Sequence, residues 1–130
     1  MIIAIDFDGT ITDAQFSDFP KIGTLRPDAF VCINYLRDVL GCKIIIWTCR
    51  SLKPDLDAMK AFLNEAGIKY DAVNVNHFVP FVQTPKIYAD IYIDDRQAGG
   101  LPESWIDILK LIKPQLEKGL GKKHHLREAQ

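Results

Sequence analysis

Two carboxylates, two residues apart, directly follow a short apolar run near the N-terminus. The run Ile-Ile-Ala-Ile, residues 2–5, precedes Asp6-Phe7-Asp8-Gly9-Thr10. Such a run predicts a central parallel strand that is buried on both faces. If the extended backbone continues, Asp6 and Asp8 lie on one side of it, and Gly9 permits a sharp turn or close approach to a ligand. Neighbouring carboxylates repel each other, so the pair requires a cation or a proton, unless it is only a solvated Asp-Gly turn.

Polar residues also follow two later apolar runs of the chain. Thr48 follows the second predicted strand, residues 43–47, and Asp94 and Asp95 follow the fourth, residues 91–93. Because ligands bind beyond the carboxyl ends of parallel strands, we expect these side chains to lie at one edge of the sheet. Four carboxylates there form an oxygen-rich site suited to a hard cation such as Mg²⁺. Thr48 and Lys86 supply a neutral and a cationic donor for phosphoryl oxygens.

These residues resemble the motifs of the haloacid dehalogenase (HAD) superfamily of phosphotransferases and phosphohydrolases. Over roughly residues 1–96, the segment Asp6-Phe7-Asp8-Gly9-Thr10, then Thr48, Lys86 and Asp94-Asp95, follow the order of the family's motifs. The ending Ile93-Asp94-Asp95-Arg96 and the short spacings are also similar to a small capless subgroup of bacterial and phage HAD proteins. The resemblance implies a Mg²⁺-dependent phosphomonoesterase that acts through an aspartyl-phosphate.

The resemblance also implies a role for each motif residue. Asp6 would be the nucleophile that attacks phosphorus in line. Asp8 would protonate the leaving oxygen and then accept a proton from the hydrolytic water, which requires a raised pKa. Thr48 would donate a hydrogen bond to a phosphoryl oxygen, and Lys86 would neutralise developing charge while holding Asp6. The second acid, Asp8, favours phosphoryl transfer over dehalogenation, since dehalogenases of the family lack it.

For the metal, the resemblance implies a site built mainly from carboxylates. Mg²⁺ would bind Asp6, the backbone carbonyl of Asp8, and Asp94. Asp95 would support the site through a water molecule or by orienting the loop. Mg²⁺ usually binds one or two protein carboxylates together with waters and a substrate phosphate, which agrees with this set.

Several further residues are candidates for contact with the substrate. Gly9, Thr10 and Arg50 are the candidate substrate-binding residues, and Arg50 either contacts a phosphate or pairs with one of the acids. Arg96 is predicted to balance the charge of the adjacent acidic pair, and Cys49 to be a small buried residue. Aromatic residues near the site either cover a ring of the substrate or pack the loops down, and we favour packing: Phe16, Phe19, Phe78 and Phe81. Three polar residues either shape the pocket or belong to a plain loop: Asn74, Asn76 and His77.

The alternation of strands and helices predicts an α/β fold, with a Rossmann-like parallel sheet, helices on both faces and right-handed crossovers. Residues 1–118 are predicted to form a single domain, followed by a frayed basic tail at 119–130. Residues 11–26 are predicted to form a loop or short hairpin. Neither this segment nor residues 49–85 is long enough for a large cap, so a minimal cap is expected. A helix is predicted between Pro27 and Gly41, with these apolar residues at helical spacing: Phe30, Val31, Ile33, Tyr35, Leu36, Val39 and Leu40.

Composition excludes several classes of function. The chain of 130 residues has 16 basic and 17 acidic residues and a net charge of -1, so no global field favours nucleic acid or a membrane. The three cysteines form no CxxC pair, so neither a disulfide framework nor a zinc site is indicated. The sequence shows no signal peptide and no apolar run of membrane-spanning length, which predicts a cytoplasmic protein.

Two questions stay open from the sequence alone. A site with a minimal cap either takes a large phosphorylated substrate, such as a nucleic acid, protein or carbohydrate terminus, or is closed by a second subunit of a homo-oligomer. The alternatives to an enzyme are a catalytically weak phosphate-binding or regulatory module and a receiver-type signalling domain. The receiver domain fits less well, because it carries its phosphorylated aspartate at a middle strand end, where this chain has Trp47-Thr48.

Overall fold

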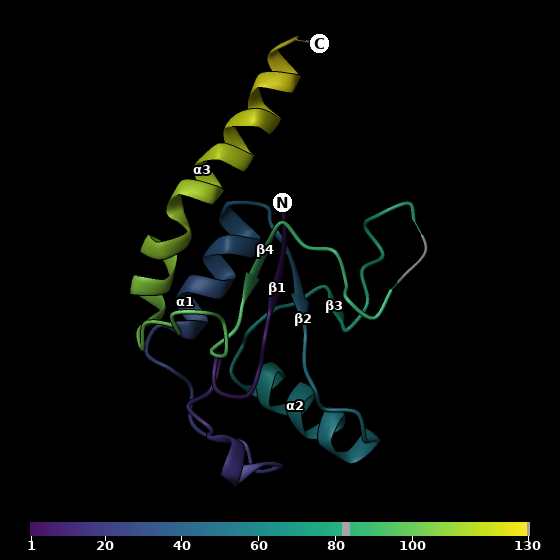
Figure 1. The fold of residues 1–130 in the computed structure, drawn as a ribbon, viewed down its shortest axis with the longest axis vertical. Helices are drawn as coiled ribbons and strands as arrows, with labels where there is room; N and C mark the ends of the chain where they lie inside the picture. Colours follow the sequence, from purple (N-terminus) through teal and green to yellow (C-terminus); the bar gives the residue numbers. More distant parts are fainter. Residues whose placement is uncertain (82–83, 130) are drawn as a thin grey trace.

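The computed structural model describes residues 1–81 and 84–129, with side chains up to residue 120 (Figure 1). Within these described residues, the regular structure consists of four strands and three α-helices, together with one short 3₁₀ helix and one π-helical turn. The strands are β1 (Ile2–Ile5), β2 (Lys43–Ile46), β3 (Ala72–Val73) and β4 (Ile91–Ile93). The helices are the 3₁₀ helix η1 (Phe16–Asp18), α1 (Ala29–Asn34), the π-helical turn η2 (Tyr35–Val39), α2 (Lys53–Glu65) and α3 (Trp105–Ala129).

The four strands form one parallel sheet in the order β3-β2-β1-β4. Ile5 of β1 lies opposite Ile46 of β2 and Ile93 of β4, so three strands end at the same level. The residues that follow these strand ends, Asp6 and Asp94 among them, therefore meet at one edge of the sheet. The prediction of a Rossmann-like α/β fold with a parallel sheet is confirmed.

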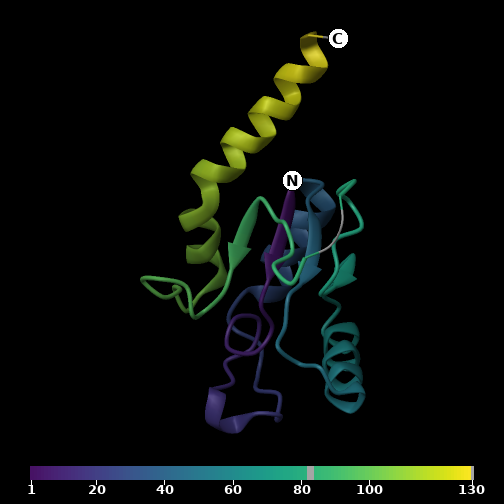
Figure 2. The same ribbon diagram turned by 45° about the vertical axis from the view of Figure 1, so that its right-hand side comes forward.

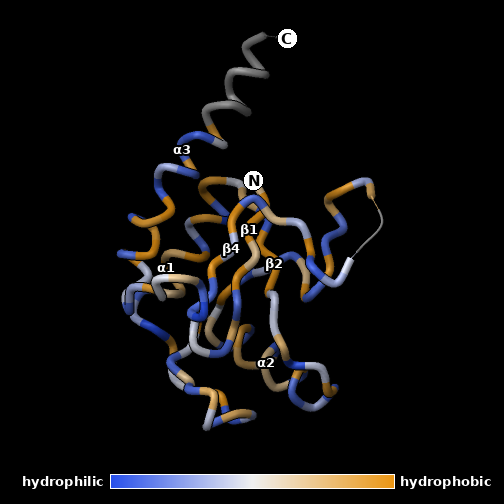
Figure 3. Tube along the Cα trace, viewed as in Figure 1, coloured by the Kyte–Doolittle hydropathy of each residue, from blue (hydrophilic) through white to orange (hydrophobic). Residues whose placement is uncertain are grey.

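The two faces of the sheet are covered differently, although hydrophobic residues predominate along β2 at its centre (Figure 3). Ile3 and Ile5 point into a large apolar cluster that also contains buried residues of α1, α2 and α3. Ala4, on the other face, packs with Ile45 against Ile87 and Ala89, which belong to the irregular segment before β4. The sequence predicts helices on both faces, and the structure differs in this respect because the described part of the β3–β4 crossover contains no helix.

The segment between β1 and β2 forms a shorter α-helix than predicted. Helix α1 ends at Asn34 and continues as the π-helical turn, in which the Leu40 N–H donates to the Tyr35 carbonyl (3.1 Å). The buried side chains of this segment are Ala29, Cys32, Ile33 and Leu36. The assignment of an inward face to Phe30, Val31, Tyr35 and Val39 is wrong, since all four are exposed. The face formed by the four buried residues packs into the large apolar cluster on one face of the sheet, which leaves the other apolar side chains of the segment outside.

Residues 11–26 form the predicted loop with a hairpin-like base. Thr12 and Leu25 make an antiparallel bridge, and Asp13 accepts hydrogen bonds from the N–H and the hydroxyl of Thr24, both at 2.8 Å. Between these anchors the chain carries η1, and Figure 2 shows the loop beyond the carboxyl end of β1. The loop therefore lies where a minimal cap is expected, next to the acidic edge of the sheet.

Helix α3 ties the C-terminal part of the chain to the residues after β1. The indole Nε1–H of the buried Trp105 donates to the Thr10 carbonyl (3.0 Å). The helix then runs past Pro114 and continues as backbone to Ala129, through the stretch that the sequence suggests to be a separate tail (Figure 1). Among the described residues, no helix is both long and apolar enough to cross a membrane.

Candidate active site and metal-binding site

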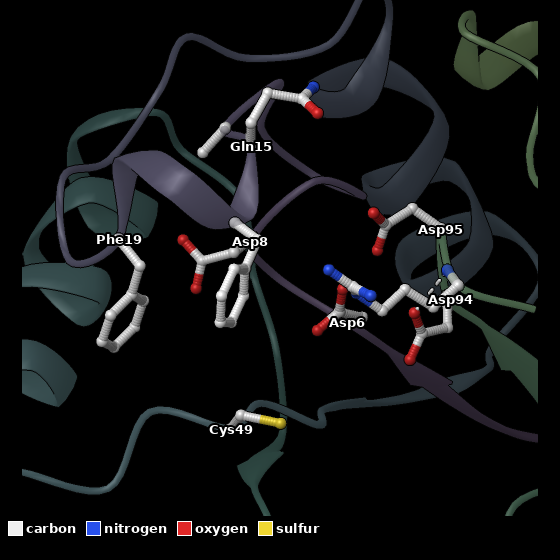
Figure 4. A pocket seen from close by; sticks show the side chains of 10 residues that line it. Asp6, Asp8, Gln15, Phe19, Cys49, Asp94 and Asp95 are labelled. Carbon is white, nitrogen blue, oxygen red and sulfur yellow. Dashed lines mark hydrogen bonds between the residues drawn. The ribbon is translucent and has the colours of Figure 1, made fainter.

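A cavity of about 490 Å³ opens at the carboxyl edge of the sheet. Figure 4 shows carboxylates on one side of it and the aromatic ring of Phe19 on the other. The walls come from four parts of the chain, namely the residues after β1, after β2 and after β4, and the loop that follows Asp8. Its lining residues are Asp6, Asp8, Ala14, Gln15, Phe16, Phe19, Cys49, Asp94, Asp95 and Arg96.

Three of the predicted metal ligands converge in this cavity. Asp6, Asp94 and Asp95 each offer one carboxylate oxygen, and these oxygens lie within 4.8 Å of one another. The Asp6 N–H also donates to the Ile93 carbonyl (2.9 Å), which fixes the end of β1 against the end of β4. In the described part of the chain, no basic side chain forms an ion pair with any of the three. The cluster thus holds closely spaced negative charge without a cationic side chain to balance it.

The electrostatics of Asp6 follow from this arrangement. Burial, the nearby charge of Asp94 and the contact with Asp95 together raise the pKa of Asp6 from 3.8 to about 8, with burial as the largest cause. A hydrogen bond from Thr10 opposes this rise only in part. Without a cation, the cluster therefore retains a proton near neutral pH. A bound divalent cation would replace that proton, since carboxylates bind metal in their ionised form.

Thr10 holds the acidic residues in place. Its Oγ1 lies 3.1 Å from Asp6 Oδ2 and 3.3 Å from Asp95 Oδ1, and the hydroxyl donates its one proton to one of them at a time. The Asp95 N–H donates to the same Oγ1 (2.9 Å). Thr10 is fully buried, so the prediction that it contacts the substrate is wrong. It positions two carboxylates instead.

Gly9 is required by the close packing of the turn against Asp95. Its φ is +84°, a left-handed backbone conformation that favours glycine. A Cβ at this position would lie 2.5 Å from Asp95 Oδ2 and 2.9 Å from Asp95 Cγ. The absence of a side chain at Gly9 therefore lets Asp95 approach Asp6 and Asp94. Gly9 was predicted to contact the substrate, and its observed contact is with a carboxylate.

Asp8 and Arg50 form a bidentate ion pair. Arg50 Nε and Nη2 donate to the two carboxylate oxygens of Asp8 at 2.8 and 2.7 Å. Figure 4 shows the Asp8 carboxylate apart from those of Asp6, Asp94 and Asp95. Its side chain does not belong to the carboxylate cluster, so only its backbone carbonyl remains as the predicted metal ligand. Of the two predictions for Arg50, pairing with an acid is confirmed.

Arg50 has no surface left for a substrate phosphate. The residue is only 1% exposed, and its Nη2 also donates to the Pro20 carbonyl (3.0 Å). The guanidinium carbon lies 5.1 Å from the ring centroid of Phe19 and 5.4 Å from that of Phe7. The prediction that Arg50 contacts the substrate is therefore wrong. Arg50 connects Asp8 to the loop after β1.

Replacing Arg50 by lysine should reveal this positioning role. Arg50→Lys keeps the charge but cannot reproduce the paired hydrogen bonds to Asp8. If Asp8 transfers protons, we expect kcat to fall by about tenfold to a hundredfold, with KM changed much less. Steady-state kinetics over a range of pH measure this. An unchanged pH profile of kcat, with only a lower melting temperature, would mean that the pair is purely structural.

Thr48 lies at the predicted strand end but outside the lining of the cavity. Its side chain is buried, and Oγ1 accepts a hydrogen bond from the Arg50 N–H (3.1 Å). The Thr48 backbone N–H and carbonyl are both bonded to the side-chain amide of Asn74, at 2.8 and 2.9 Å. Asn74 thus joins the end of β3 to the end of β2 and does not line the pocket. The hydroxyl proton of Thr48 is still able to serve as a donor.

Lys86 is not brought to the carboxylate cluster. The side chain is exposed, and its ammonium group lies 5.5 Å from the centroid of the Tyr92 ring. It does not line the cavity, and among the described residues it forms no ion pair with Asp6. The predicted contact between Lys86 and Asp6 is therefore absent from this structure. Lys86 belongs to the irregular segment that covers the second face of the sheet.

The loop residues around the cavity differ most from the predictions. Phe16 and Phe19 are 83% and 46% exposed and line the cavity, so the prediction that they only pack the loop is wrong. Cys49, predicted to be buried, is exposed in the cavity wall. The Arg96 guanidinium lies 5.6 Å from the Phe16 ring centroid and forms no described ion pair with the acidic residues. Gln15 also lines the cavity, and nothing in the sequence marks it beyond its place in the loop after Asp6 and Asp8.

The fold and site together define an α/β protein with an acidic pocket at the carboxyl edge of a parallel sheet. No protein-family model matches the sequence, and no curated protein matches it. Among solved structures, the chain is similar to a conserved protein coded by a locus of Bacteroides thetaiotaomicron. The identity is 32%, the match covers 88% of this chain and 91% of that one, and the TM-score is 0.75. At this identity and coverage, the chain belongs to the same family as that conserved protein.

Proposed function

We propose that this protein is a Mg²⁺-dependent phosphomonoesterase of the HAD type. The observation that carries this proposal is the group of three carboxylates, Asp6, Asp94 and Asp95, whose oxygens lie within 4.8 Å and lack a cationic partner among the described ion pairs. The carboxylate of Asp8 lies apart from these three and is bound by Arg50 through two hydrogen bonds. A metal-binding cluster beside a separately held carboxylate is suited to nucleophilic attack on a phosphate ester with proton transfer.

The donor set fits a small hard cation. All three side chains offer carboxylate oxygens, which Mg²⁺ prefers over nitrogen or sulfur. Asp6, Asp94 and Asp95 would hold the ion, and the HAD resemblance adds the backbone carbonyl of Asp8. When bound, Mg²⁺ would neutralise the charge of the phosphoryl oxygens and favour the ionised form of Asp6.

The reaction would proceed in two displacements at phosphorus. In the first, an Asp6 carboxylate oxygen forms a bond to phosphorus as the bond to the alcohol oxygen breaks, and Asp8 donates a proton to that oxygen. In the second, a water oxygen attacks phosphorus, Asp8 accepts the water's proton, and the Asp6 carboxylate leaves. Inorganic phosphate and the free alcohol are the products.

The ion pair with Arg50 suits Asp8 for the second displacement. Both oxygens of Asp8 accept hydrogen bonds from Arg50, and this arrangement would orient the carboxylate to receive a proton from water. The first displacement requires a protonated Asp8, which must give up at least one of these hydrogen bonds. Arg50 would therefore bind Asp8 through two hydrogen bonds when Asp8 is ionised, and through fewer when Asp8 carries the proton for the leaving oxygen.

Chemical trapping tests the covalent intermediate directly. An aspartyl-phosphate is an acyl phosphate, which borohydride reduces to an alcohol. We expect protein quenched with borohydride during turnover to carry the homoserine side chain at Asp6, as detected by peptide mass spectrometry. Protein without substrate is the control. Steady turnover without any modification of Asp6 would contradict the proposed nucleophile.

The exposed position of Lys86 leads to a separate prediction. Since Lys86 lies over Tyr92 and not beside Asp6, we expect Lys86→Ala to keep kcat/KM within about threefold of the parent, less than 1 kcal/mol in the barrier. Initial rates of phosphate release measure this, with Lys110→Ala on α3 as the control. A loss of two orders of magnitude would show that substrate binding carries Lys86 into the site, as the HAD resemblance implies.

The position of Lys86 away from Asp6 also favours a second candidate function. A protein whose lysine stays away from Asp6 could bind phosphate, or become phosphorylated, without efficient turnover. In that case, release of the alcohol would stop after about one equivalent per protein molecule while the phosphoryl group stays on Asp6, and borohydride would still modify Asp6 after the substrate is removed. Continuous release over many equivalents would exclude this regulatory module and support the enzyme.

A further inference from the structure

We propose that the cavity wall opposite the carboxylates binds a flat aromatic ring in the leaving group of the substrate. The substrate class would be small phosphomonoesters whose alcohol carries such a ring. This inference rests on the proposed function for the direction of the leaving group, and it adds the chemical nature of that group. Three features of the cavity support the inference. They are the position of Phe19 beside Asp8, the second aromatic ring of Phe16, and the size of the cavity.

Phe19 lies beside the residue that would protonate the leaving oxygen. The guanidinium of Arg50 is bonded to both oxygens of Asp8, and its carbon lies 5.1 Å from the centroid of the Phe19 ring. Asp8 and Phe19 therefore surround one buried cation. Figure 4 shows Asp8 between Phe19 and Asp6. A phosphate attacked by Asp6 and protonated by Asp8 would direct its leaving group toward Phe19.

Phe16 provides a second aromatic surface on the same loop. It is 83% exposed although it lines the cavity, and one face of the ring is covered by Arg96 (5.6 Å from guanidinium carbon to ring centroid). Phe19 is likewise covered on one face by Arg50. An arginine packs over each ring, and the exposed fractions of 83% for Phe16 and 46% for Phe19 leave ring surface in the cavity on which a ligand can stack.

The size of the cavity fits a small substrate. A volume of about 490 Å³ lies within the range of sites for small molecules and cofactors, roughly 300–1,000 Å³. Such sites combine apolar or aromatic walls with a few polar groups that fix orientation. Here the carboxylates would fix the phosphate through the metal, and Phe16 and Phe19 would provide the aromatic wall. Stacking on these rings favours a planar group over a puckered one of similar size.

Two phosphonates that cannot be hydrolysed test the inference independently of turnover. Benzylphosphonate and cyclohexylmethylphosphonate share the phosphonate and the size of the substituent, and they differ in flatness. By calorimetry with saturating Mg²⁺, we expect the benzyl compound to bind about fivefold more tightly. Phe16→Leu and Phe19→Leu should each bring this ratio close to one. Phe30→Leu, at an exposed phenylalanine of α1 outside the cavity, should leave the ratio unchanged.

The outcomes separate this inference from the proposed function. Equal binding of the two phosphonates, binding of neither, or a ratio unchanged in both cavity variants would overturn the aromatic subsite. A benzyl preference that depends on Phe16 and Phe19 supports it, even if benzyl phosphate is not hydrolysed, in which case only the proposed function fails. A comparison of AMP with ribose 5-phosphate identifies the source of the ring. If AMP is preferred over ribose 5-phosphate by a similar factor, the substrates are nucleoside monophosphates. If it is not, the substrates are other aromatic monoesters.

Discussion

Asp6→Asn is expected to reduce phosphate release by at least about 10⁴-fold, because the amide is neither a nucleophile nor an anionic metal ligand. In the metal-free protein, the same change should increase stability at pH 8. The pKa of Asp6 is raised from 3.8 to about 8 by burial and by Asp94, so the folded chain retains a proton that the unfolded chain releases. The free energy of unfolding contributed by Asp6 therefore falls as pH rises from about 4 to 8.

Thermal unfolding in EDTA between pH 5 and pH 9 measures this effect. The difference in unfolding free energy between Asp6→Asn and the parent should grow with pH, reaching roughly 2–4 kcal/mol in favour of the variant. Asp107→Asn, at an exposed position on α3, controls for the loss of one negative charge. A difference that does not depend on pH would mean that Asp6 is already ionised in the folded metal-free protein.

Gly9→Ala should disrupt the carboxylate cluster without altering any carboxylate. The added Cβ would lie 2.5 Å from Asp95 Oδ2, in a backbone with φ of +84°. We expect a loss of roughly 2–4 kcal/mol in the free energy of unfolding, from the left-handed backbone together with the displacement of Asp95. Mg²⁺ should then stabilise the variant much less than the parent, because Asp95 is moved away from Asp6 and Asp94.

Gly99→Ala is a matched control for this variant. Gly99 has nearly the same backbone angle, φ of +86°, but nothing lies within 4 Å of an added Cβ. Its substitution should cost only the backbone strain, about 1–2 kcal/mol. The shift in melting temperature on adding Mg²⁺ should remain that of the parent. An equal response of Gly9→Ala and the parent to Mg²⁺ would show that Asp95 has no part in metal binding.

The position of the acidic cluster could be predicted because it depends on a simple rule. Parallel strands that end together bring the residues after them to one edge, and the apolar runs that precede Asp6 and Asp94 are short and easily recognised. The observed register of Ile5 with Ile46 and Ile93 satisfies this rule. The sheet and the metal-binding candidates therefore followed from local patterns in the sequence.

The side chains that depend on irregular backbone could not be predicted in the same way. Whether Arg50 met a phosphate or an acid depended on how the chain turned after β2, and the turn directs it to Asp8. The position of Lys86 depends on a long segment that has neither helical nor strand periodicity. The inward face of α1 was wrongly assigned because apolar residues occur all around that helix, so their spacing does not show which of them are buried.

From the sequence, the aromatic residues of the loop after β1 were expected to pack the loop and not to contact a ring of the substrate. The sequence around Phe16 and Phe19 does not distinguish rings that pack against the loop from rings that line a cavity. Their exposure became clear only with the path of the loop, which Thr12 and Leu25 anchor at its base. The substrate class is therefore inferred from the structure and not from the motifs.

Metal-dependent release of phosphate is the measurement that tests the central claim most directly. The assay follows inorganic phosphate from benzyl phosphate, AMP and p-nitrophenyl phosphate, with Mg²⁺ and with EDTA, for the parent and for Asp94→Asn. We predict multiple turnovers by the parent with Mg²⁺, background release with EDTA, and recovery when excess Mg²⁺ is restored. Asp94→Asn should be slower at every Mg²⁺ concentration. Equal rates with Mg²⁺ and with EDTA would contradict a catalytic metal site at Asp6, Asp94 and Asp95.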